Sequence, residues 1–246
     1  MSPSLSAVST GRAPASDRRS GWAAGWHVIT LLVVVLSLGT QLVMVIRGID
    51  VLVPQEGQAP GVLTRVLRFF SYFTVQSNIL VALSVLPLLR YPAMDDRAWR
   101  VLRLDALMGI SVTGVVFVVA LRPIVDLSGV SALTNVGFHY LSPLLAVVGW
   151  LLFGPRPRID RTTLLWSLAW PLAWLAYTLV HGALTDWYPY PFIDAGELGY
   201  PVTLLNAALV TVLMLIVGAL FSFADARLPA RPVVTSNEYV AIPDRH

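Results

Sequence analysis

Six apolar runs limit this chain to a small set of folds. A helix needs about 20 apolar residues to cross the hydrocarbon core of a bilayer, because it rises only 1.5 Å per residue. No water is available there to pair backbone groups, so only helices and closed barrels can span it. The runs cover residues 22–46, 67–89, 102–121, 132–153, 162–185 and 202–223. The sequence therefore predicts an all-α, multi-pass membrane protein with six transmembrane helices.

Composition agrees with this class and argues against others. Of the 246 residues, 56% are hydrophobic and 13% are charged, and the mean hydropathy is +0.71, which is far from the balance of a soluble domain. The absence of cysteine excludes disulfides, thiol nucleophiles and thiolate metal sites. The net charge of +3 comes from arginines in short loops, so we interpret it as a topology signal and expect no nucleic-acid partner. No metal ion or cofactor is expected.

Arginine placement predicts the orientation. All 17 basic residues are arginine, and thirteen lie on the side of the two termini, in the tails and the second and fourth loops. Because cytoplasmic loops carry the excess of basic residues, both termini are predicted to be cytoplasmic. The expected domains are a disordered tail 1–21, a membrane domain 22–223 and a tail 224–246. The residue usage is typical of a GC-rich bacterium, so we expect a multi-pass protein of the bacterial inner membrane.

Five polar side chains interrupt the second run: Ser71, Thr74, Gln76, Ser77 and Asn78. An unpaired hydroxyl or amide in hydrocarbon costs several kcal/mol, so such a cluster indicates a partner, a substrate or a cavity. In a continuous helix with 3.6 residues per turn, four of them share one face while Gln76 points the other way. Gln76 is therefore predicted to be a packing contact.

Two further stripes lie at a similar depth, roughly 8–10 Å below the outer ends of their helices at 1.5 Å per residue. They comprise Asn135, His139 and Ser142 in the fourth run, and Trp170, Trp174, Tyr177, Thr178, His181 and Thr185 in the fifth. Three stripes at one depth predict a cavity toward the outer leaflet, with polar atoms near its mouth and apolar walls below.

Thr74 and His139 are the predicted catalytic pair. A threonine hydroxyl becomes a nucleophile when a base takes its proton, and a neutral imidazole is the usual base near pH 7. An amide of Asn78 or Asn135, or the imidazole of His181, is a candidate donor to an oxyanion. The residues predicted to support the pair or bind substrate are Asn78, Asn135, Ser142, Trp174, Tyr177 and His181.

Each of these residues also has a structural interpretation. Intramembrane threonines commonly bond their own backbone, asparagines commonly join helices, and aromatic stripes pack or anchor at the interface. Trp187, Tyr188 and Tyr190 of the last outer loop are typical of such an interfacial aromatic belt. No acidic residue is obviously placed to orient His139, which weakens the case for a triad.

The chain resembles the androgen-induced transmembrane protein family over about residues 22–223. The resemblance rests on Phe73-Thr74, on Asn135-Val136-Gly137-Phe138-His139 with Pro143, and on His181 followed by Trp187-Tyr188-Pro189-Tyr190-Pro191-Phe192. Members of that family are multi-pass threonine hydrolases that cleave fatty-acid esters of hydroxy fatty acids. The resemblance, which is closer to the bacterial branch, implies Thr74 as nucleophile, His139 as the second catalytic residue and a lipid or fatty-acid ester as substrate.

Two other classes of function remain open. The polar layer could serve packing alone, in a non-catalytic lipid-binding or interaction membrane protein. Alternatively, His139 and His181 could be axial ligands of one haem, although membrane cytochromes that hold two haems need more histidine pairs. The oligomeric state is not predicted.

Overall fold

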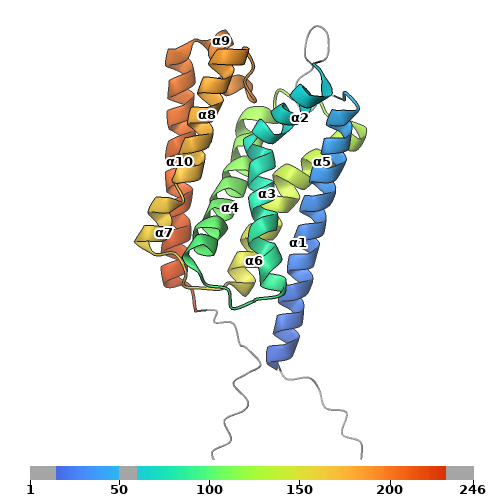
Figure 1. The fold of residues 1–246 in the computed structure, drawn as a ribbon. Helices are drawn as coiled ribbons and strands as arrows, with labels where there is room; N and C mark the ends of the chain where they lie inside the picture. The colour runs from blue at the N-terminus through green and yellow to red at the C-terminus, as the bar shows by residue number, and fades with distance from the viewer. Residues whose placement is uncertain (1–14, 50–59, 231–246) are drawn as a thin grey trace, which may run out of the picture.

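The protein is a bundle of helices in a computed structural model that describes residues 15–49 and 60–230 (Figure 1). Within these ranges the chain has no β-strand. Five helical segments there are long and apolar enough to cross a membrane, or six if one bent pair of helices counts as a span. The prediction of a multi-pass helical membrane protein is confirmed. Residues 1–14 and 231–246, which belong to the predicted tails, and residues 50–59 lie outside the described residues.

The helices follow the predicted apolar runs but differ from them at their ends. The five segments long and apolar enough to span are α1 (Ala15–Ile46), α4 (Arg97–Val116) with η2 (Phe117–Leu121), α5 (Gly129–Val136) with η3 (Gly137–Leu141) and α6 (Ser142–Phe153), α7 (Arg161–Trp166) with α8 (Ala169–Thr185), and α10 (Tyr200–Arg227). The bent pair is α2 (Val62–Ser71) with α3 (Phe73–Val85). Short helical turns are η1 (Leu86–Leu89), η4 (Pro191–Ile193) and α9 (Ala195–Leu198). Both α1 and α10 extend into segments predicted as tails, because each added residue of a helix gains a backbone hydrogen bond.

Helix α4 is the centre of the bundle. In the span that contains α4, 61% of the residues in the most apolar 18-residue stretch are buried. The corresponding share is 17% in the span formed by α7 and α8. Helices α3, α6, α7 and α10 pack against α4. Its fully buried side chains include Leu104, Leu107, Met108, Ile110 and Val112. The outer helices therefore expose many apolar side chains, as expected for a surface in contact with lipid.

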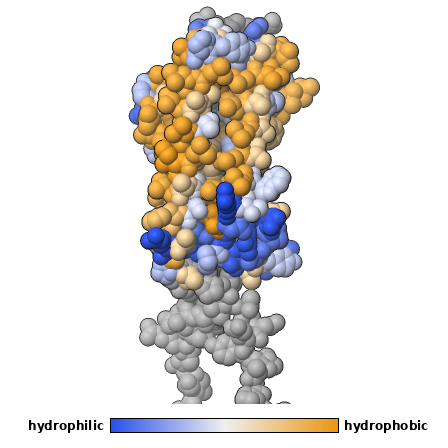
Figure 2. All heavy atoms as spheres, turned by 90° about the vertical axis from the view of Figure 1, so that its left-hand side faces the viewer, coloured by the Kyte–Doolittle hydropathy of each residue, from blue (hydrophilic) through white to orange (hydrophobic). Residues whose placement is uncertain are grey.

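Charged residues gather at one end of the bundle, below an apolar face (Figure 2). The start of α1 and the end of α10 lie at this end (Figure 1). There the carboxylate of Asp95 pairs with Arg100 at 2.6 Å and with Arg158 at 2.7 Å. The side chain of Asp160 accepts a hydrogen bond from the amide of Thr163 and so caps α7.

The second predicted helix is interrupted at Tyr72. Helices α2 and α3 meet there at an angle of 69°, and Tyr72 has an extended backbone with φ −67° and ψ 129°. The prediction of one continuous helix over 67–89 is therefore wrong, and Ser71 does not share a helix with Thr74. The break leaves the last carbonyls of α2 and the first amides of α3 without partners in their own helices.

Side chains of α8, of the loop that follows it and of α3 itself pair these backbone groups. The Trp174 indole N–H donates to the Ser71 carbonyl at 2.9 Å, and the side-chain amide of Gln76 donates to the Phe70 carbonyl at 3.0 Å. The backbone amide of Thr74 donates to the Tyr190 hydroxyl at 3.0 Å. Trp170 stacks on Phe73 with ring centroids 4.7 Å apart and donates to the Gln76 side chain at 3.0 Å. The aromatic stripe of α8 thus closes the break, and Gln76 has a hydrogen-bonding role in addition to the predicted packing.

Replacing Trp174 tests this account of the break. Trp174→Phe keeps an aromatic ring and removes the indole N–H, so the Ser71 carbonyl loses its donor. We expect the free energy of unfolding to fall by about 1–3 kcal/mol. Trp166→Phe, on the exposed surface of α7, is the matched control and should change little. Thermal unfolding in detergent measures both variants, and equal midpoints would contradict the proposed role of Trp174.

Candidate active site

Thr74 lies in the first turn of α3, immediately after the break. Its side chain is buried. The first amides of a helix have no acceptor in the helix, and together they carry a partial positive charge that favours anions. The Thr74 hydroxyl therefore sits beside backbone donors that a continuous helix would have used internally.

His139 meets Thr74 from η3. Its Nε2 is 3.3 Å from Thr74 Oγ1, and its Nδ1 is 3.2 Å from the carbonyl oxygen of Asn135. A carbonyl oxygen can only accept, so this hydrogen-bond network assigns the proton to Nδ1 and leaves the lone pair of Nε2 facing the threonine hydroxyl. The structure thus brings together the two residues that the sequence proposed as nucleophile and base, and their catalytic roles stay a prediction.

Two π-helical turns meet at His139. Both η2 and η3 are closed by hydrogen bonds between residues five apart, a widened geometry that is frequent at functional sites. Phe117 of η2 stacks on the imidazole of His139 with ring centroids 4.1 Å apart. Gly137 of η3 packs directly on Ser37 of α1, and a Cβ at this position would collide with the serine side chain. These contacts determine the position of the imidazole.

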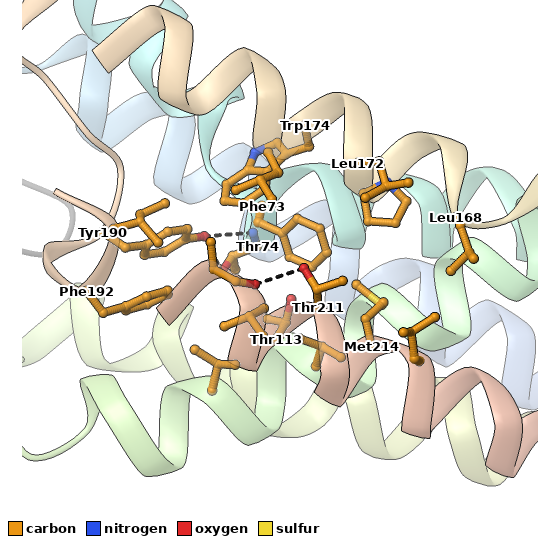
Figure 3. A pocket seen from close by; sticks show the side chains of 18 of the residues that line it. Phe73, Thr74, Thr113, Leu168, Leu172, Trp174, Tyr190, Phe192, Thr211 and Met214 are labelled. Carbon is orange, nitrogen blue, oxygen red and sulfur yellow. Dashed lines mark hydrogen bonds between the residues drawn. The ribbon is translucent and has the colours of Figure 1, made fainter. Parts of the chain in front are cut away.

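Tyr190 is the residue of this site that the sequence reasoning missed. Its hydroxyl oxygen is 3.0 Å from the backbone nitrogen of Thr74 and 3.2 Å from Thr74 Oγ1 (Figure 3). Because the Thr74 hydroxyl donates to His139, the Tyr190 hydroxyl must donate to Thr74 Oγ1 while it accepts from the amide. The network therefore runs from Tyr190 through Thr74 and His139 to the carbonyl of Asn135.

The predicted interfacial belt is wrong for two of its three members, because Trp187 and Tyr190 are buried. Tyr72, at the helix break, contacts both rings edge-on, with centroids 5.8 Å from Trp187 and 5.5 Å from Tyr190. Tyr190 also stacks on Phe192 at 5.3 Å. The prolines that flank Tyr190 were a usable signal, since they favour an extended path for the loop.

An apolar cavity of about 250 Å³ lies on one side of Thr74. It is lined by α3, α4, α8, α10 and the loop before α9, with Tyr190 and Phe192 at one end and Leu168 and Met214 at the other (Figure 3). Thr211 also lines it, but its hydroxyl donates to the carbonyl of Ala207 in its own helix. Of the three stripes predicted to line one cavity, only Thr74 and Trp174 line this one, while Asn135 and His139 line the smaller cavity described next, so the predicted three-stripe lining is not observed.

A smaller and more polar cavity of about 30 Å³ lies on the other side of Thr74. Its polar lining is formed by Gln41, Ser131, Thr134, Asn135, His139 and Thr74. A water molecule needs about 10–15 Å³ by this measure, together with polar partners. The space is large enough for one or two waters beside His139, and Thr74 forms part of the wall of both cavities.

The predicted oxyanion donors have other partners. Asn78 donates to the carbonyl of Thr74 at 2.9 Å, within its own helix, so neither of its predicted roles, oxyanion donor or link between helices, is observed. Asn135 acts through its backbone carbonyl, while its side chain lines the polar cavity. Ser142 is fully buried, and its hydroxyl has no hydrogen-bond partner among the described residues.

The aromatic residues of α8 support the helix break. The Tyr177 hydroxyl is 2.7 Å from Ser71 Oγ, and Trp174 also lines the apolar cavity. His181 packs against Tyr177 and Trp187, with Nδ1 3.3 Å from the Thr185 hydroxyl. It lines neither cavity beside Thr74, so the structure does not bring it into this site.

No metal-binding cluster is found in the described parts of the chain, where no three His, Asp or Glu side chains lie close enough to share an ion. His139 and His181, the two possible haem ligands, have separate sets of neighbours. Comparison of the chain with family models, curated proteins and solved structures found no match. The case for a function therefore rests on the geometry around Thr74.

The burial of Tyr190 predicts a pH dependence of stability. Burial, at 4% exposure, raises the pKa of Tyr190 from 10 to about 12. The neutral phenol is thus favoured in the folded state, so its contribution is complete below pH 10 and is lost as the pH rises toward 12. We expect Tyr190→Phe to show a smaller loss of thermal midpoint between pH 8 and pH 11.5 than wild type. The exposed Tyr91→Phe is the control, and identical pH profiles for all three proteins would contradict the assignment.

Proposed function

We propose that this protein is an integral membrane hydrolase of lipid esters, with Thr74 as nucleophile and His139 as general base. One observation carries the proposal: the Thr74 hydroxyl touches an imidazole and a phenol, and it separates an apolar cavity from a small polar one. The resemblance of the motifs around Thr74 and His139 to the androgen-induced transmembrane protein family supports the same chemistry. We also propose six spans, cytoplasmic termini and a bacterial inner membrane, in agreement with the charged end of the bundle.

The first step is acyl transfer to the enzyme. Thr74 Oγ1 attacks the ester carbonyl carbon while its proton passes to His139 Nε2, and the carbonyl π electrons move to the oxygen. Collapse of the tetrahedral intermediate expels the alcohol oxygen, which takes the proton back from the imidazolium. The products are a free alcohol and an acyl-threonine ester, whose chain lies in the apolar cavity.

Two hydrogen-bond donors stand beside the attacking oxygen. In the resting site the Thr74 amide donates to the Tyr190 hydroxyl, and Tyr190 donates to Thr74 Oγ1. A carbonyl oxygen that enters between these groups can accept from both as its negative charge develops. Donors of this kind act strongly in a dry site because they are already oriented before the reaction.

Hydrolysis of the acyl-enzyme requires water on the side away from the acyl chain. The polar cavity provides that side, since His139 and Thr74 both line it. A water there gives one proton to His139 Nε2 and attacks the acyl carbon, and collapse of the intermediate returns the proton to Thr74 as the fatty acid leaves. Separate cavities for acyl chain and water explain why Thr74 belongs to both walls.

The base is oriented by a backbone carbonyl and not by a carboxylate. The carbonyl of Asn135 accepts from Nδ1 of His139 and so holds the imidazole in the tautomer that the reaction needs. A carbonyl stabilises the imidazolium less than a buried carboxylate does. The sequence therefore lacked an orienting acid because the main chain of the same helical segment takes that position.

A non-catalytic lipid-binding protein is the second candidate function. The apolar cavity of about 250 Å³ suits an acyl chain without any chemistry. Packing alone, however, does not require the contact between the Thr74 hydroxyl and an imidazole lone pair. The substitutions below separate the two functions.

Thr74 and Thr113 provide a matched pair for testing the nucleophile. Both hydroxyls belong to buried threonines that line the apolar cavity, but only Thr74 touches His139. We expect Thr74→Val to abolish labelling by a lipophilic fluorophosphonate and ester hydrolysis, Thr74→Ser to keep part of both, and Thr113→Val to keep most of both. His139→Gln should lower the rate by about 10²–10⁴-fold. Undiminished labelling of Thr74→Val would remove Thr74 as the nucleophile.

Tyr190→Phe tests the second oxyanion donor. Loss of one such donor typically lowers kcat by about 10²–10³-fold with little effect on KM. Tyr188→Phe removes a hydroxyl from the same loop and is the control, since the tyrosine hydroxyl that bonds to Thr74 is that of Tyr190. Steady-state hydrolysis of a lipid ester in nanodiscs measures both variants. A Tyr190→Phe enzyme with the kcat of wild type would show that the phenol only positions the loop.

A further inference from the structure

We propose that the substrate is a membrane-resident ester that inserts a single acyl chain sideways from the lipid, through the wall between α8 and α10. That the ligand is an ester rests on the proposed function. The route of entry is inferred from the geometry of the apolar cavity. Entry from lipid defines a substrate class, because the ester must reside in the bilayer before it reaches Thr74.

The wall of the cavity is thin on one side. Leu172 of α8 and Leu215 of α10 both line the cavity, and 52% and 47% of their surfaces are exposed. At these two positions the bundle therefore covers the cavity least. On the opposite side, Val112 of the central helix α4 also lines the cavity and is fully buried.

The two helices that form the thin wall make little direct contact with each other. Helix α10 packs mainly on α4, on α9 and on η4, while α8 packs on α9. The face of the bundle seen in Figure 2, on the side of α8 and α10, is largely apolar above the charged end. The Thr211 hydroxyl at the wall is already bonded within its helix, so it presents no unpaired polar group to an entering chain. Lateral opening therefore costs mainly apolar side-chain movement.

The end of the cavity next to the last outer loop is closed more firmly. Tyr190 and Ile193 of this loop are buried and line the cavity at that end. Asn206 of α10 donates to the carbonyl of Phe192 at 2.8 Å and fixes the loop to the helix. A water-soluble ester entering there would have to break these contacts. The thin apolar wall is the easier path.

The size of the cavity suits one chain. A cavity of about 150 Å³ holds a benzene ring, so about 250 Å³ corresponds to roughly ten carbon atoms. Its lining follows α10 from Ala207 to Leu215, a length of roughly 12 Å at 1.5 Å per residue. A chain held this way lies along the helices, in the direction of the chains of the surrounding lipid. A second chain of the same molecule would remain in the bilayer.

The absence of native cysteine allows a direct test of the route. The probe is a decanoyl monoglyceride with a diazirine at the chain end, placed in nanodiscs with Thr74→Val protein so that no turnover is needed. Cysteine is introduced at Leu172 or Leu215 and modified with a bulky methanethiosulfonate reagent. The control is Val180→Cys, which is exposed on the same helix α8 and does not line the cavity.

Photolysis should give adducts on cavity residues such as Val116 and Met214, mapped by mass spectrometry. We expect modification at Leu172→Cys or Leu215→Cys to reduce these adducts at least tenfold, with recovery after reduction of the label, and modification at Val180→Cys to change them less than twofold. Adducts confined to the lipid-facing surface, or equal effects at all three positions, would overturn the proposal. Because this readout requires no catalysis, its failure is distinct from a failure of the Thr74 variants in hydrolysis.

Discussion

The hydrogen bonds that pair the backbone at the α2–α3 break support the rest of the site. Unpaired backbone groups at membrane depth cost several kcal/mol each, and irregular backbone is tolerated there only inside the protein or along a cavity. Trp174 of α8 donates to the Ser71 carbonyl, and Tyr190 of the loop between α8 and α10 accepts from the Thr74 amide. The arrangement of α8 and of this loop against α3 is therefore tied to the break, and the break is stable only with both in place.

The same break provides a backbone hydrogen-bond donor for the proposed reaction. In a continuous helix the Thr74 amide would bond the carbonyl of Phe70, which here accepts from the Gln76 side chain. The freed amide lies next to the Thr74 hydroxyl, where a developing negative charge would form. His139 arrives on a second irregular segment, the π-helical η3. Two departures from regular helix thus meet at one hydroxyl, with apolar space on one side and polar space on the other.

Helical phase and depth were enough to propose Thr74 and His139 as neighbours, and Thr74 Oγ1 lies 3.3 Å from His139 Nε2. The same reasoning failed for His181, because a residue at the right depth can still face a different neighbour. It also failed for Tyr190, since aromatic residues after a helix suit an interfacial belt or an inward loop equally well. For Asn135 the sequence suggested a role for the side-chain amide, whereas in the structure its main-chain carbonyl accepts from the imidazole of His139.

The sequence by itself determined the environment and the problem that the fold must solve. Long apolar runs require helices in lipid, and polar residues inside those runs require partners. Only the tertiary structure decided which residues those partners are. The periodicity of a helix describes neighbours three or four residues apart, whereas the bonds at Thr74 join it to residues 65 and 116 positions away. Such pairings depend on how the helices bend and pack, and the break at Tyr72 sets that geometry.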